Sequence, residues 1–121
     1  MTDELKLNKM SQFLKTAGDP TRLKIMLSLL DDGQCHCGCS AIGDCSKCKC
    51  LSCMIEKRVS DIVLEINESQ SLVSHQLKTL KEADFVKDRK EGTSIYYSLK
   101  DGHVKELLSV VKEHVEELEN D

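Results

Sequence analysis

Residues 69–80 read SQSLVSHQLKTL, and this stretch decides how the rest of the chain is interpreted. Its apolar residues recur at the spacing of one helix face, and Ser69 stands where a helix needs an N-cap. The face expected to be buried consists of Val73, Leu77 and Leu80. The opposite face carries small polar side chains followed by cations. The stretch therefore predicts a helix that packs on a core and presents a polar surface.

Two helices are expected near the start of the chain, and a third directly before the quoted stretch. The first runs from about Asp3 to Ala17. Asp19-Pro20 then reads as an N-cap and a proline at the first position of the second helix, which Gly33 closes. The expected apolar faces are Leu23, Met26, Leu27 and Leu30 in the second helix and Val59, Ile62, Val63 and Ile66 in the third. Asn67-Glu68 is then the short connection of a helix-turn-helix.

The hydrophobic period changes after the quoted stretch. Polar and apolar residues alternate from Ser94 to Leu99, which predicts a half-buried strand with Ile95, Tyr97 and Leu99 on its inner side. Residues 86–90 are expected to pair with it through a turn at residues 91–93. A last helix is expected from about Asp101 to Glu119. Its apolar stripe is Val104, Leu107, Leu108, Val111, Val115 and Leu118.

These elements predict a mainly α-helical winged helix-turn-helix with one small β-hairpin. A length of 121 residues fits a single domain over residues 1–121 that contains a Cys-rich insert at about residues 34–54. The helices at both ends of the chain remain free to form an interface. No apolar run approaches the ~20 residues of a membrane span, and the charged N-terminus has no apolar signal core. We therefore expect a cytoplasmic protein with no membrane partner.

Composition narrows the functional class. Lys and Arg number 17 against 21 Asp and Glu, a net charge of −4, which excludes a uniformly basic surface for nucleic acid. Two Phe, two Tyr and no Trp are too few for a platform on which single strands stack. Residues 69–100 nevertheless carry six basic and four acidic side chains, a local excess of +2. Positive charge is therefore concentrated on the quoted helix and the hairpin.

The polar helix face and the hairpin form a candidate DNA-binding surface. Amides and hydroxyls suit base edges and phosphates, and ammonium groups suit the phosphate backbone. The expected contacts on the helix are Ser69, Gln70, Ser71, Ser74, His75, Lys78 and Lys81, and those on the hairpin are Lys87, Arg89 and Lys90. Each element alone would pass for a solvated surface. Their succession favours double-stranded operator DNA as the partner.

Three segments resemble the ArsR/SmtB family of metal-responsive repressors. Asp19-Pro20-Thr21-Arg22-Leu23 resembles its DPTRL signature, the quoted stretch resembles its recognition helix, and residues 89–99 resemble its wing. The resemblance implies a homodimer, joined through its terminal helices, that binds operator DNA when metal-free and releases it on binding metal. Two departures stand out. Asp84-Phe85 replaces the family's usual Gly-Leu, and the Cys-rich insert replaces a short connection.

The last helix carries four residues that suit zinc: Asp101, His103, His114 and Glu117. His103 and His114 are eleven residues apart, hence about 16 Å apart along a helix axis, so one ion cannot bind both within a chain. Two such helices packed antiparallel would bring Asp101 and His103 of one chain to His114 and Glu117 of the other, giving two four-ligand sites. The spacing is also similar to the C-terminal zinc site of the SmtB branch. The alternative is an acidic helix with two incidental histidines.

The chemistry of these four ligands favours particular ions. Two nitrogens and two carboxylate oxygens suit zinc or cobalt better than copper(I) or arsenite. Ligation needs neutral histidines, so the affinity for metal is expected to fall as the pH drops toward 6.

The Cys-rich insert holds all seven cysteines of the chain. An odd number, crowded into one segment without a signal peptide, argues for metal or redox chemistry rather than disulfides. The candidate ligands are Cys35, His36, Cys37, Cys39, Cys45, Cys48, Cys50 and Cys53. Three interpretations stay open: a structural zinc site, a sensing site for a softer thiophilic ion such as cadmium, lead, copper(I) or arsenite, and a thiol redox switch.

The sequence as a whole predicts a metal-sensing transcriptional repressor and not an enzyme. The first alternative is a repressor that is controlled at the insert, by soft-metal binding or by thiol oxidation. A metal-storage or delivery protein is the rival from another class, because eight Cys and His ligands lie within nineteen residues. That rival leaves the polar helix face and the basic hairpin unexplained.

Overall fold

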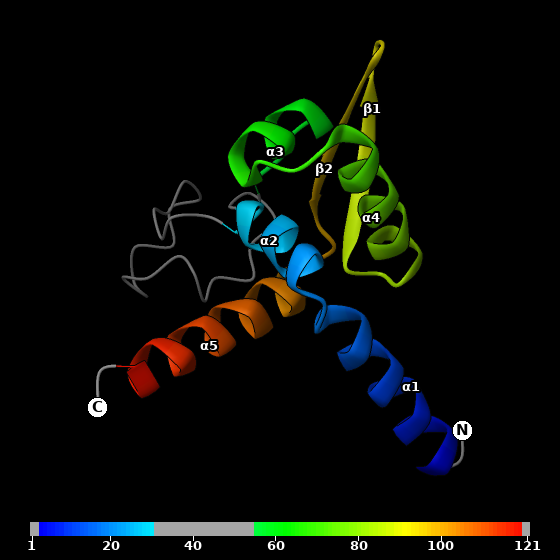
Figure 1. Cartoon of the computed structure of the whole chain (residues 1–121). Coiled ribbons are helices and arrows are strands. Elements are labelled where there is room, and N and C mark those ends of the chain that lie inside the picture. Colours follow the sequence, from blue (N-terminus) through cyan, green and yellow to red (C-terminus); the bar gives the residue numbers. More distant parts are fainter. Residues whose placement is uncertain (1–2, 31–54, 120–121) are drawn as a thin grey trace, which may run out of the picture.

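Five helices and one hairpin make up the part of the chain that the computed structural model describes, residues 3–30 and 55–119 (Figure 1). They are α1 (Asp3–Ala17), α2 (Pro20–Ser28), α3 (Val59–Ile66), α4 (Gln70–Glu82), β1 (Val86–Glu91), β2 (Ser94–Leu99) and α5 (Gly102–Glu119). Helices α2, α3 and α4 form the centre, the hairpin projects from one side of it, and α1 and α5 diverge on the other (Figure 1). This arrangement confirms the predicted winged helix-turn-helix.

The helix ends follow from local chemistry. Asp19 caps α2, because its side chain accepts a hydrogen bond from the amide of Arg22 at 3.1 Å, and Pro20 opens the helix. Ser69 caps α4 through the amide of Leu72 at 3.2 Å. Asn67 ends α3 in the left-handed region, with φ 57°, which turns the chain sharply into α4. These caps confirm the predicted boundaries of the helix-turn-helix.

The hairpin pairs Val86 with Leu99 at its base and Glu91 with Ser94 at its tip. Gly92 stands in the two-residue turn with φ 61°, a conformation that glycine adopts without strain. Asp84 has φ 64° in the connection from α4 to β1, a left-handed conformation that aspartate tolerates better than most residues.

The core lies where α2, α3, α4 and the base of the hairpin meet. It contains the predicted face of α4 together with Ile62 of α3 and Phe85. Phe85 is fully buried and stacks on Phe13 of α1, with ring centroids 4.0 Å apart. Arg22 links the same elements through hydrogen bonds to the side chain of Gln76 at 2.8 Å and to the carbonyl of Thr16 at 3.2 Å.

Two sequence predictions about α2 need correction, although Met26 is buried and Leu23 and Leu30 pack against the core as predicted. The helix ends at Ser28, short of Gly33, which lies outside the described residues. Its buried residues include Ile25 and Met26, whereas Leu27 is 42% exposed. Ile25, Met26 and Leu27 are consecutive and point in three directions around this short helix, so their spacing alone does not identify the buried side. The positions of α3 and α4 select it instead.

The strict alternation predicted for β2 is also wrong at both ends. Ile95 is 42% exposed, because the tip of the hairpin projects beyond the core and has nothing to pack on (Figure 1). Ser98 is buried beside Leu99 at the base of the hairpin. The backbone of Lys57 pairs with Tyr97 at the same place through two hydrogen bonds, of 2.9 and 2.7 Å. This pairing fixes the segment before α3 against the hairpin.

Helix α5 packs on the core through its first turns only. Val104 and Leu108 are buried, but the apolar stripe then continues into solvent as Val110, Val111, Val115 and Leu118, which are all exposed. Helix α1 likewise exposes Leu7, Met10 and Leu14. No helix in the described part of the chain is long and apolar enough to cross a membrane.

We expect Phe85→Ala to lower the free energy of unfolding by about 3–5 kcal/mol, because it leaves a cavity beneath Phe13. Leu64→Ala is the control, since Leu64 is 83% exposed, and a change within about 0.5 kcal/mol is expected for it. Denaturant unfolding at one fixed protein concentration measures both values. Equal losses for the two variants would contradict the assigned core.

Candidate nucleic-acid interface and metal ligands

The polar face of α4 is free of the protein's own core. All seven residues predicted to contact DNA from this helix and its cap are exposed: Ser69, Gln70, Ser71, Ser74, His75, Lys78 and Lys81. The Ser69 hydroxyl is already used as the helix cap. Lys78 forms no ion pair with another described residue. A polar helix face exposed next to a projecting hairpin is the shape that enters a major groove.

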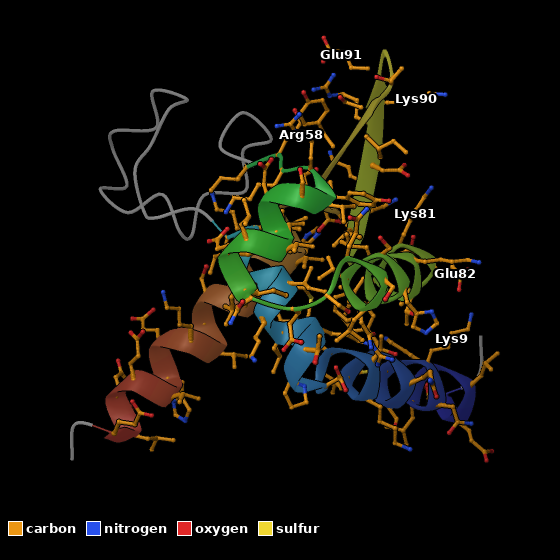
Figure 2. All side chains as sticks on the ribbon, turned by 45° about the horizontal axis from the view of Figure 1, so that its top comes forward. Lys9, Arg58, Lys81, Glu82, Lys90 and Glu91 are labelled. Carbon is orange, nitrogen blue, oxygen red and sulfur yellow. The ribbon has the colours of Figure 1, made fainter. Side chains whose placement is uncertain are left out.

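Lys81 has a second task that its sequence position does not indicate. Its ammonium group binds Asp88 of β1 at 2.8 Å, which fastens the end of α4 to the hairpin. The hydrogen bond and charge of Asp88 raise the pKa of Lys81. Lys81 and Lys90 project on the same side of the molecule in Figure 2. Asp88 therefore already neutralises part of the positive charge that Lys81 contributes to this surface.

Arg89 is held by two carboxylates. Its Nε donates to Glu56 at 2.8 Å, its Nη1 donates to Glu91 at 2.7 Å, and its guanidinium lies 5.0 Å from the centre of the Tyr96 ring. These hydrogen bonds raise the pKa of Arg89. Lys87 and Lys90 form no ion pair within the described residues. Glu56 could not be identified from the sequence, because no local pattern connects it with Arg89, 33 positions later in the chain.

The four predicted metal ligands of α5 form two separate pairs. Asp101 caps the helix, because its Oδ1 accepts hydrogen bonds from the amides of His103 at 2.9 Å and Val104 at 3.1 Å. The Nδ1 of His103 lies 3.8 Å from the same oxygen, and the ring is 81% exposed. His114 and Glu117 are exposed on the same uninterrupted helix, one turn apart.

The described residues of one chain do not bring these pairs together. Across residues 3–30 and 55–119, no three His, Cys, Asp or Glu side chains gather closely enough to hold a metal ion. The rise of an α-helix separates the pairs by about 16 Å. The insert ligands predicted from Cys35 to Cys53 lie outside the described residues. Each pair thus offers two candidate ligands within one chain.

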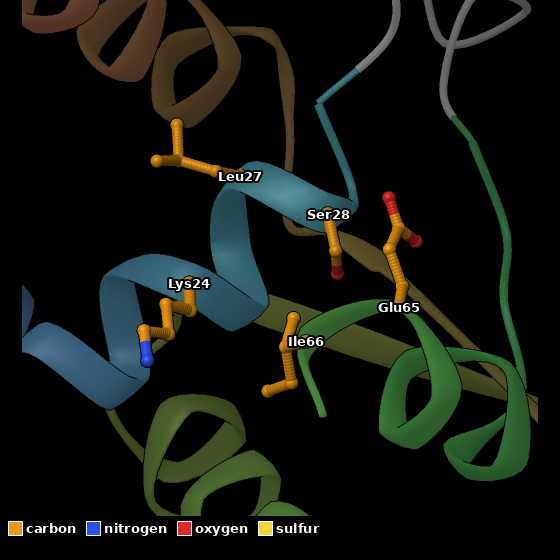
Figure 3. Close-up of a pocket in the computed structure, with 5 residues that line it drawn as sticks. All are labelled: Lys24, Leu27, Ser28, Glu65 and Ile66. Carbon is orange, nitrogen blue, oxygen red and sulfur yellow. The ribbon is translucent and has the colours of Figure 1, made fainter. Parts of the chain in front are cut away.

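Two hollows in the described part of the chain are large enough for a small ligand. One of about 390 Å³ lies between α1 and α5 and is lined by Lys9, Met10, Phe13, Leu14 and Leu107, so it belongs to the exposed apolar surface of the terminal helices. The other, of about 420 Å³, lies between α2 and α3 and is lined by Lys24, Leu27, Ser28, Glu65 and Ile66 (Figure 3). Its charged groups are paired, Glu65 with Lys57 and Lys24 with Glu68. Neither hollow gathers polar groups that would recognise a small molecule.

The chain is similar in sequence to known DNA-binding regulators. Residues 53–88 match the family described as "Bacterial regulatory protein, arsR family". The uncharacterized HTH-type transcriptional regulator MJ1325 of Methanocaldococcus jannaschii is 35% identical over 108 residues, which are 89% of this chain and 97% of that protein. A Synechocystis transcriptional repressor SmtB homolog is 31% identical over 109 residues, 90% of this chain and 65% of that protein.

A solved structure shares the fold. The homodimeric winged helix-turn-helix DNA-binding domain of Mb0332 from Mycobacterium bovis has a TM-score of 0.72 to this chain at 22% identity, covering 100% of this chain and 94% of that one.

We expect Asp101→Ala to destabilise the metal-free protein by about 0.5–2 kcal/mol, because the variant loses the helix cap. Asp101→Asn keeps an acceptor at the cap and is expected to restore most of that loss. His103→Ala is the matched control and changes stability by no more than about 0.5 kcal/mol. Thermal unfolding in the presence of a chelator measures all three. A loss for His103→Ala as large as that for Asp101→Ala would contradict the capping role.

Proposed function

The chain belongs to the arsR family of bacterial regulatory proteins, and from that premise we propose that it is a metal-sensing transcriptional repressor. It binds operator DNA as a homodimer and releases it when zinc or a similar ion binds between its α5 helices. The observation that carries this proposal is the pairing of an exposed polar α4 with two incomplete ligand pairs on an exposed, apolar stretch of α5.

DNA binding is supported by the surface of α4 and the hairpin. Gln70, Ser71 and Ser74 present amide and hydroxyl groups to base edges at the start of α4. Lys78, Lys87 and Lys90 supply cations for phosphates. The net charge of −4 does not oppose this role, because residues 101–121 carry two basic and seven acidic side chains and lie on a separate helix.

Dimerisation is supported by apolar surface that the chain does not cover itself. Val110, Val111, Val115 and Leu118 of α5 and Leu7, Met10 and Leu14 of α1 are exposed. Exposed apolar side chains gathered on a helix face are typical of an interface. A two-fold axis through it buries the same residues on both copies. The Mb0332 domain, which shares this fold, is described as homodimeric.

Two copies complete the metal site. When the α5 helices lie antiparallel, Asp101 and His103 of one chain meet His114 and Glu117 of the other. Asp101 fits this task beside its capping role, because the amides bind Oδ1 and no hydrogen bond to a described residue engages Oδ2. Two imidazole nitrogens and two carboxylate oxygens form a donor set that suits zinc or cobalt.

Coupling follows from the connection between β2 and α5. Only Lys100 and Asp101 separate the wing strand from the last helix, so a change in how the two α5 helices pack re-aims both wings and both α4 helices. Metal must favour the arrangement that does not fit DNA, and DNA then weakens metal binding by the same factor. A switch from 99% to 1% of the DNA-competent state requires about 5.5 kcal/mol of differential binding.

One observation favours a second candidate, a repressor controlled at the Cys-rich insert by a softer ion or by thiol oxidation. The chain leaves the insert at Ile55, and the next two residues, Glu56 and Lys57, contact the hairpin directly. A change of state in the insert would therefore reach the wing by a short route.

Operator binding tests these two proposals. Reduced, metal-free protein is titrated with duplex DNA that the wild type selects from a random-sequence pool, and the titration is repeated with zinc and with cadmium. We expect zinc to weaken binding by about 5- to 150-fold. His114→Ala loses this response, whereas a variant with Cys45, Cys48, Cys50 and Cys53 changed to Ser keeps it. Sedimentation shows whether each variant remains dimeric.

The opposite pattern supports the second candidate. If the cysteine variant loses the response while His114→Ala keeps it, the sensor is the insert. If the metal-free wild type has no sequence-specific DNA binding at physiological salt, the repressor assignment is wrong and metal storage becomes the better explanation.

A further inference from the structure

We propose that Glu56 limits the affinity of the repressor for DNA by holding the guanidinium group of Arg89 in an ion pair that phosphate must displace. Glu56 is a positioning residue, since it acts on DNA through Arg89. The inference rests on the proposed function. It adds a residue outside both the recognition helix and the α5 ligands that sets how tightly the wing binds.

The place of Glu56 is fixed by the backbone on both sides of it. Lys57 forms two backbone hydrogen bonds with Tyr97 of β2, and the amide of Arg58 donates to Asp61 in the first turn of α3 at 3.1 Å. Glu56 therefore stays beside the hairpin as part of a short strand-like segment. An ion pair between anchored segments loses less side-chain freedom than a pair between two mobile side chains.

Two ion pairs brace the hairpin from opposite faces. Asp88 and Arg89 are neighbours on β1, and successive side chains of a strand point to opposite faces. Asp88 binds Lys81 of α4, and Arg89 binds Glu56 ahead of α3. The first pair neutralises Lys81, a cation on α4 itself. The second draws Arg89 toward α3.

The charge count around Arg89 is unfavourable for DNA. One guanidinium stands with the carboxylates of Glu56 and Glu91, so the cluster carries a net charge of −1. The Arg89 side chain is 50% exposed and those of Glu56 and Glu91 are 39% and 67% exposed, so phosphate can reach the cluster. Exposed ion pairs are individually weak, which allows this exchange.

Arg89 keeps the means to bind phosphate once a carboxylate leaves. A guanidinium has five N–H groups in a fixed fork, and the two carboxylates occupy Nε and Nη1. The Tyr96 ring supports the group from its cross-strand position. Removing the charge of Glu56 changes the cluster from −1 to neutral and leaves this support in place.

Glu56→Gln tests the inference. We expect tighter binding to the selected duplex, by about threefold per wing and so about tenfold per dimer at low salt, the effect of one unit charge about 6 Å from a phosphate in water. The slope of log K against log salt is expected to steepen by up to about one unit per wing. Glu91→Gln, at the tip of the hairpin, is expected to act in the same direction.

Glu82→Gln is the matched control. It removes one exposed negative charge at the end of α4, and Glu82 forms no ion pair with another described residue. Its effect on DNA affinity is expected to stay below that of Glu56→Gln. In an Arg89→Ala background, Glu56→Gln is expected to change affinity no more than the control does, because the two residues act as one unit.

The outcomes separate the two proposals. A wild type that binds no DNA specifically contradicts the proposed function itself. A wild type that binds, with Glu56→Gln unchanged, weaker, or equally effective without Arg89, overturns the inference about Glu56 and leaves the repressor assignment standing. Melting temperatures recorded in parallel confirm that the compared variants are folded.

Discussion

The straightness of α5 is the constraint on which the account of this protein depends. The helix runs without interruption from Gly102 to Glu119, so a fixed rise per residue keeps His103 about 16 Å from His114, and Asp101 lies farther still from Glu117. In the proposed four-ligand site, each pair therefore needs two more ligands. Between the two pairs, Val110 and Val111 are apolar and exposed, and Val115 and Leu118 continue this surface, which makes a second copy of the helix the natural source of the missing ligands. In this proposal, metal binding therefore requires the dimer.

On the proposed DNA-binding side, some cations likewise lack a carboxylate partner among the described residues, and others are paired. Lys78, Lys87 and Lys90 remain without carboxylate partners among the described residues, whereas Lys81 and Arg89 are paired. The paired cations fasten the hairpin to α4 and to the segment before α3, which sets the angle of the wing. These ion pairs limit the affinity for DNA. For a repressor that must release its operator this is useful, because at moderate affinity a modest coupling free energy is enough to shift the protein from the bound to the free state.

Local signals made much of this structure predictable. Asp19, Ser69 and Asn67 fix helix ends by their own side chains, and the spacing of Val73, Leu77 and Leu80 identifies the buried face of α4. Helix α2 could not be oriented in this way, because Ile25, Met26 and Leu27 are consecutive and point in three directions around it. The exposure of Ile95 depends on how far the hairpin projects, and the pairing of Glu56 with Arg89 joins distant parts of the chain. The four candidate ligands at and on α5 were visible in the sequence, whereas the proposed site also needs a second molecule, which the sequence of one chain does not describe.

Mixed dimers test this closure most directly. One variant carries Asp101→Asn with His103→Ala, the other His114→Ala with Glu117→Gln, both with the seven cysteines changed to Ser so that cobalt reports only on α5. Neither homodimer retains a complete site, whereas a heterodimer has one. The account predicts that cobalt gives a tetrahedral absorption spectrum only after the two variants exchange subunits. A spectrum from either variant alone, or none from the mixture when the cysteine-free parent gives one, would contradict it.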